Sequence, residues 1–125
     1  MRDKTTQPGY INVEFTGGET LVSQELVEIT GDNIVMKPVA AGSFNLVGEV
    51  VIPCDTSGDP CTIGTFFTKL RTYTTGAVVT VGAIVLDANN NVINYNAAAH
   101  DSAAILGLAI EADAISGCDI NCLVR

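Results

Sequence analysis

Short stretches in which apolar and polar residues alternate predict that this chain is built from β-strands. The last stretch, residues 118–124, is the clearest of them. Its apolar face consists of Cys118, Ile120, Cys122 and Val124, and Asp119 and Asn121 occupy the opposite face. A period of two is typical of a strand with one buried face. We therefore predict a half-buried strand at this end of the sequence.

The stretch before it, residues 105–113, is apolar on both faces and carries Gly107 near its middle. A glycine inside a strand marks a bulge, a barrel corner or a second backbone that passes close by. The pattern does not choose among these three. Residues 114–117 supply the turn into the last strand, and we expect the two strands to form the centre of the fold.

A third long stretch, residues 77–87, is rich in β-branched residues and is followed by three asparagines and then by residues 92–95. Asparagine tolerates a left-handed backbone conformation, which hairpin turns require. We predict a strand, a hairpin turn and a short returning strand. Residues 97–102 are predicted to be a loop.

The first half of the chain has weaker strand patterns. Residues 20–29 partly satisfy helical spacing but also fit a strand, and we interpret them as mostly strand. The other expected elements are strands at residues 10–15, 34–37 and 44–52, and a loop bounded by Cys54 and Cys61.

Residues 65–74 are dense in β-branched and aromatic side chains and predict one further strand. Such a strand would carry both aromatic and cationic residues on one face, a mixture that suits contact with a partner or another subunit. The alternative is a solvated edge strand whose long side chains cover apolar surface. The candidate interface residues are Tyr10, Phe66, Phe67, Lys69, Arg71 and Tyr73.

The order of elements over residues 76–125 resembles that of tailed-phage head decoration proteins, also called capsid cement proteins. In that family a segment like residues 79–87 precedes one like Gly-Leu-Ala-Ile-Glu-Ala at 107–112, and a terminal strand closes a small β-barrel. The resemblance implies a protein whose sheet edges and N-terminal arm contact neighbouring capsomers. It also implies a location on the capsid exterior and the major capsid protein as partner.

The balance of apolar and charged residues favours self-association. Hydrophobic residues make up 47% of the 125 residues and charged residues only 16%, which suggests that protein covers part of the surface. We expect an oligomer, most simply a homotrimer. The net charge of −8 disfavours direct binding to nucleic acid, because phosphates would repel the protein.

The first nine residues are polar and include Pro8 and Gly9, so we predict a flexible N-terminal arm at 1–9. No apolar run approaches the roughly 20 residues that cross a bilayer, and the N-terminus lacks the apolar centre of a signal peptide. We therefore expect synthesis in a host cytoplasm and no membrane partner.

The four cysteines admit three interpretations. Cys118 and Cys122 lie about 13 Å apart in an extended strand, too far to bridge each other. Cys54 and Cys61 flank one loop and could form a disulfide, as could a pair on neighbouring strands. Free thiols suit a protein kept in a cytoplasm, whereas the spacing matches no common zinc pattern.

Residues that could support catalysis are scarce. His100 is the only histidine and stands beside Asp101 and Ser102, but neighbours on one loop cannot converge on a common atom as triad members do. Asp55 and Asp59 share a polar loop that lacks the downstream Glu of a calcium-binding EF-hand. We predict no enzyme, no cofactor and no metal site.

These patterns together predict an all-β protein, a small β-barrel or sandwich over residues 10–125 with an extended N-terminal arm. The function that we expect is that of a structural virion protein, which binds between major capsid protein subunits and stabilises the shell. The alternative is a β-rich tail or host-attachment module.

Overall fold

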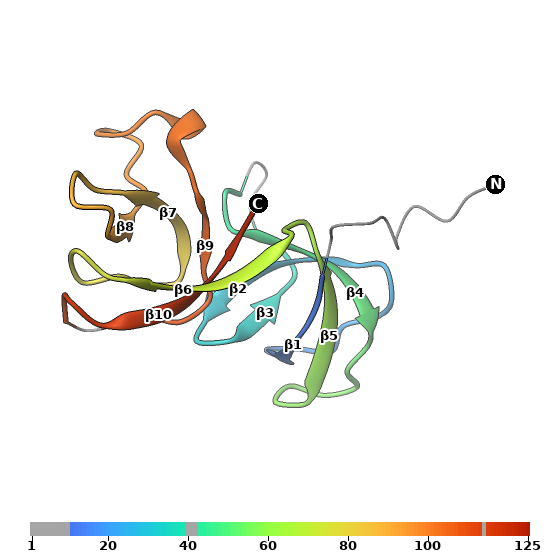
Figure 1. The fold of residues 1–125 in the computed structure, drawn as a ribbon. Helices are drawn as coiled ribbons and strands as arrows, with labels where there is room; N and C mark the ends of the chain where they lie inside the picture. Colours follow the sequence, from blue (N-terminus) through green and yellow to red (C-terminus); the bar gives the residue numbers. More distant parts are fainter. Residues whose placement is uncertain (1–10, 40–42, 114) are drawn as a thin grey trace.

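A computed structural model describes residues 11–39, 43–113 and 115–125, and the description below refers to these residues. The predicted arm at 1–9 and Tyr10 lie outside them. The described chain consists of β-strands and one short 3₁₀ turn, η1 (Ser102–Ala104), arranged as two neighbouring sheets (Figure 1). The prediction of an all-β fold with a small barrel is confirmed, but the first half of the chain forms that barrel. The terminal strand, which the resemblance implied would close the barrel, belongs to the second sheet instead. No helix in the described part of the chain is long and apolar enough to span a membrane.

The first half of the chain forms a closed five-stranded barrel. Its strands follow the spatial order β1-β3-β2-β4-β5. Antiparallel pairing of β1 with β5 and a short parallel pairing of β1 with β3 close the circle. The strands are β1 (Asn12–Gly17), β2 (Leu26–Gly31), β3 (Ile34–Met36), β4 (Leu46–Ile52) and β5 (Pro60–Thr65).

The second half forms a five-stranded antiparallel sheet in the order β6-β10-β9-β7-β8. A bridge between Thr75, which follows β6, and Val92 on β8 brings the two ends of this sheet together, so the sheet is strongly curled. The strands are β6 (Lys69–Thr74), β7 (Gly82–Leu86), β8 (Val92–Asn94), β9 (Gly107–Ala109) and β10 (Asp119–Val124).

The two central strands β9 and β10 differ in part from their sequence patterns. The strand predicted at 105–113 is paired only over Gly107–Ala109, and β10 is not half-buried along its whole length, because Leu123 on its other face is buried in the shared core. On β10, Ile120, Cys122 and Val124 face an apolar cluster inside the curled sheet. On β9, Ala109 joins that cluster, whereas Leu108 points to the other side and packs with the barrel core. Both faces of β9 are therefore covered by apolar side chains.

Gly107 marks neither a bulge nor a barrel corner. It lies where the backbone of another strand passes close by. A Cβ atom built on Gly107 would lie 2.0 Å from the carbonyl oxygen of Leu123 on the paired strand β10. Gly48 on β4 repeats the arrangement, since its Cβ would lie 2.1 Å from the carbonyl oxygen of Gly64. In each sheet, therefore, one pair of strands can lie this close together only because a glycine stands at the point of contact.

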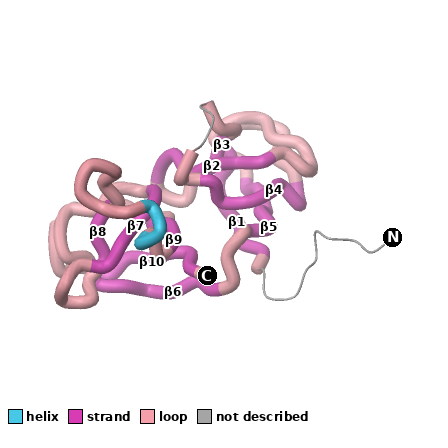
Figure 2. The backbone as a smooth tube through the Cα atoms, turned by 90° about the horizontal axis from the view of Figure 1, so that it is seen from above, coloured by secondary structure: helices cyan, strands magenta, loops and turns pink. Residues whose placement is uncertain are grey.

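The barrel and the second sheet lie side by side and share one core (Figure 2). Three hydrogen bonds also cross between them. The backbone N–H of Asn33 donates to the carbonyl of Ile110 at 2.8 Å, and the N–H of Ala112 donates to the Asp32 carboxylate at 2.7 Å. In the third, the N–H of Ala83 donates to the side-chain oxygen of Asn45 at 3.1 Å.

Two strand predictions and one loop prediction need correction. Residues 65–74 are not one strand, because the chain turns a corner after Thr65 and begins β6 at Lys69. The loop predicted between Cys54 and Cys61 ends at Pro60, where β5 begins. In the run at 77–87, regular pairing begins only at Gly82, and Val79 makes an isolated bridge to Asp113.

Candidate interaction surface

The predicted interface residues divide between the surface and the core. Lys69 and Arg71 are exposed on β6, and Tyr73 on the same strand is half-buried. Phe66 is 42% exposed at the corner between β5 and β6. Tyr10 lies outside the described residues, so the structure does not place it with the others.

Phe67 belongs to the core, and its prediction as a surface residue is wrong. Its side chain is 6% exposed and packs in the shared apolar cluster. The cause is the corner after β5, where the Thr65 hydroxyl donates to the carbonyl of Phe67 at 2.9 Å and accepts from its N–H at 3.3 Å. The corner interrupts the alternation, so Phe67 does not share a face with Lys69.

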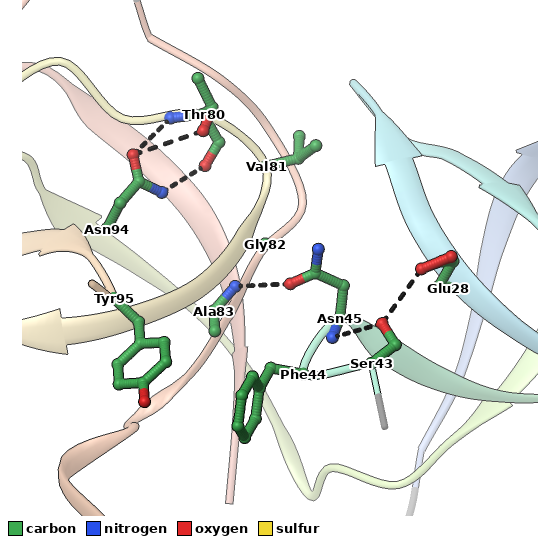
Figure 3. Close-up of a pocket in the computed structure, with 10 residues that line it drawn as sticks. All are labelled: Glu28, Ser43, Phe44, Asn45, Thr80, Val81, Gly82, Ala83, Asn94 and Tyr95. Carbon is green, nitrogen blue, oxygen red and sulfur yellow. Dashed lines mark hydrogen bonds between the residues drawn. The ribbon is translucent and has the colours of Figure 1, made fainter. Parts of the chain in front are cut away.

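The strand β6 is an edge strand of the second sheet, because all six of its residues pair with β10 on one side only. The opposite edge strand, β8, is covered by the segment that follows β6. Gly76 donates its N–H to the carbonyl of Val92 at 2.9 Å. Further along, the Asn94 side chain accepts from the N–H of Thr80 at 3.0 Å and donates to its carbonyl at 2.9 Å (Figure 3).

Cationic side chains gather at one end of β6. Val124 pairs with Lys69, so Arg125 follows directly beside the start of this strand. Lys37, the other cation of the described chain, lies on the barrel side and forms ion pairs with Glu19 and Glu25 at 3.8 and 3.7 Å. The structure gives ion pairs within its described residues to Lys37 alone. The end of β6 therefore carries cations that form no ion pair with a carboxylate of the described residues.

A groove of about 390 Å³ with both apolar and polar lining residues, Arg125 among them, lies between the barrel and the second sheet. Phe66 and Phe44, the latter 55% exposed, contribute aromatic rings to it. Ile105 and Arg125 line it from the second sheet. Sequence reasoning missed Phe44 and Arg125, because only the packing of the two sheets brings them to Phe66.

A second hollow, of about 500 Å³, lies over the joint between the sheets (Figure 3). Its carboxylate, Glu28, is held by the Ser43 hydroxyl at 3.0 Å and the Val39 N–H at 3.4 Å. Asn45 reaches across to Ala83, and a Cβ on Gly82 would lie 2.8 Å from the Asn45 side-chain oxygen. These polar groups are already hydrogen-bonded within the protein, so the hollow forms part of the contact between the two sheets.

His100 and Asp101 are engaged separately and do not form a catalytic pair. The ring Nδ1 of His100 accepts a hydrogen bond from the N–H of Asn96 at 3.0 Å. The Asp101 carboxylate accepts from the N–H of Ala103 at 3.0 Å and caps η1. Both side chains stabilise the conformation of the loop in which they lie.

All four cysteines are free thiols. Cys54 and Cys61 are buried in the barrel core, and Cys122 is buried in the curled sheet. Cys118 is half-buried, and a hydrogen bond with Asp113 raises its pKa. Over the described ranges, no group of three or more His, Cys, Asp or Glu side chains is placed to hold a metal ion.

The buried Cys122 thiol predicts a loss of stability at alkaline pH. Burial, with a smaller contribution from the Glu111 charge, raises the pKa of Cys122 from its ordinary 9.0 to about 12. The unfolded chain therefore loses this proton first, so the stabilisation is complete below pH 9 and declines as the pH rises from 9 to about 12. The expected slope is about 1.4 kcal/mol per pH unit for this thiol.

Urea unfolding of wild type and Cys122→Ala from pH 8 to 11 tests this expectation. The variant should be less stable by about 1 kcal/mol at pH 8, should match the wild type near about pH 10, and should be the more stable protein at pH 11. Cys61, whose pKa burial and Cys54 raise to about 11, titrates in both proteins and cancels in the difference. A difference that stays constant with pH would show that Cys122 does not titrate with folding.

No model of a known protein family matches this chain, and no curated protein matches it in sequence. The fold and the surface features described above define its class, an all-β protein with a closed barrel and a curled second sheet.

Proposed function

We propose that this protein is a structural component of a phage virion, which decorates the capsid and stabilises it by binding between major capsid protein subunits. The observation that carries the proposal is the exposed edge strand β6, which lies next to the exposed aromatic side chains of Phe66 and Phe44. Unpaired strand edges and exposed aromatic residues are features of surfaces that bind other proteins.

The resemblance to decoration proteins over residues 76–125 supports the same proposal. These residues supply four of the five strands of the second sheet, which pair with one another in an unbroken order. The resemblance therefore falls on a structurally coherent part of the protein. The proposed partners are the major capsid protein and further copies of this chain in a homotrimer, and the proposed location is the capsid exterior.

Co-sedimentation with empty shells tests the proposed function. The shells would be assembled from the major capsid protein encoded in the same genome, and the full chain would be titrated onto them. We expect saturable binding at a fixed ratio to capsid subunits, and a rise in the temperature at which the shells disrupt. An unrelated β protein of similar size and net charge is the control.

Absence of saturable binding to intact shells would contradict the proposal. Binding to purified tails in place of shells would assign the protein to a tail or host-attachment structure. Cryo-EM of decorated shells would then show whether three copies meet at each site, as the trimer proposal requires.

A further inference from the structure

We infer that β6 receives an extended, acidic segment of the shell protein, which adds to the second sheet as a further strand and sets its carboxylates against Lys69 and Arg71. The inference deepens the proposed function and rests on it for the identity of the partner. The location of the contact, its geometry and its charge follow from this chain alone.

The backbone of β6 has the hydrogen-bonding groups that an added strand would need. An edge strand presents unpaired N–H and C=O groups along its outer side. The barrel is closed, and β8 is covered by the segment at 75–80, so in the described chain β6 is the edge strand whose residues 69–74 pair on one side only. An added strand would gain main-chain hydrogen bonds there, the source of affinity in strand-addition complexes.

The side chains on one face of β6 select the charge of the added strand. Lys69 and Arg71 stand opposite Val124 and Cys122, so their stems lie over the edge of the cluster inside the curled sheet. Both side chains are exposed and have no ion-pair partner among the residues that the structure describes. Carboxylates on the added strand would provide ion-pair partners for these two cations.

The other face of β6 selects an apolar neighbour. Thr72 and Thr74 donate their hydroxyl groups across the strand pair to Asn121 at 3.0 Å and Asp119 at 2.8 Å, so these hydroxyls are already used. Leu70 on the same face is 47% exposed. An added strand that alternates acidic and apolar residues would therefore match both faces.

A second copy of this chain fits the edge poorly. Pairing β6 with β6 of another copy would bring two Lys69 and two Arg71 side chains to one short interface, and like charges that face each other oppose association. The closed barrel offers no edge strand to donate. The charge of the edge thus points to a different, acidic segment.

The experiment measures binding of the full chain to the same empty shells with the edge cations neutralised. Glutamine keeps much of the side-chain stem, so the double variant Lys69→Gln/Arg71→Gln removes charge with little change in packing. We expect about tenfold weaker binding at low salt and a smaller salt dependence. The matched control is Lys37→Gln, which removes a cation from the barrel side and should change the affinity less than about twofold.

Amide hydrogen exchange provides the second readout, because strand addition protects backbone N–H groups. Backbone amides of residues 69–74 should exchange more slowly when the wild type is bound to shells. If the wild type does not bind, the proposed function itself fails. If it binds but the double variant binds equally well, or residues 69–74 gain no protection, the inference about β6 is overturned while the proposed function stands.

Discussion

Replacing Gly107 with alanine should prevent the second sheet from forming its native pairing. The new Cβ would lie 2.0 Å from the Leu123 carbonyl oxygen and 3.1 Å from the Val124 Cα atom. Both contacts are to the backbone of β10, which is itself fixed by pairing with β6. Relief requires β9 and β10 to separate, so we expect a loss of about 3 kcal/mol, a large share of the stability of a small domain.

Gly31→Ala is the matched control for this prediction. Its Cβ would meet only the Ile34 side chain, whose nearest atom is the terminal Cδ1 at 3.3 Å and can move, so we expect a change within about 1 kcal/mol. Urea unfolding followed by circular dichroism measures both variants. A Gly107→Ala protein as stable as the Gly31→Ala protein would show that β9 and β10 can part without loss.

Leu108→Ala should destabilise the barrel as strongly as the sheet to which Leu108 belongs. Leu108 is 1% exposed and lies in one cluster with Phe15 and Val27 of the barrel. Truncation of a buried leucine costs about 2–5 kcal/mol. Because the two sheets share this core, we expect one cooperative unfolding transition, shifted as a whole in the variant.

Native-state hydrogen exchange resolves the two halves separately. In Leu108→Ala, the most protected amides of β1–β5 and of β7–β10 should lose equal amounts of free energy. Leu70→Ala, at a side chain 47% exposed, should cost less than about 1 kcal/mol and serves as the control. A barrel that keeps its wild-type protection in Leu108→Ala would show that the halves fold independently.

The sequence by itself determined the features that depend on neighbouring residues. The period of two identified the apolar face of Ile120, Cys122 and Val124 on β10, whereas the apolar run at 105–113 located β9 but not its extent, since only Gly107–Ala109 are paired. The asparagines before β8 marked a hairpin turn, and Asn90 adopts the left-handed conformation that such a turn needs. These signals are local, because alternation and turn preference act over two to ten residues.

Only the tertiary structure decided which residues meet across long separations. Phe67 is buried because the chain turns at Thr65, and that turn is fixed by pairing of β5 with β1 and of β6 with β10, strands some 50 residues away in sequence. The same register pairs Val124 with Lys69 and so places Arg125 next to the start of β6. A single-sequence pattern gives the face of a strand but not its partner, since the partner is selected by closure of the whole barrel and sheet around a shared core.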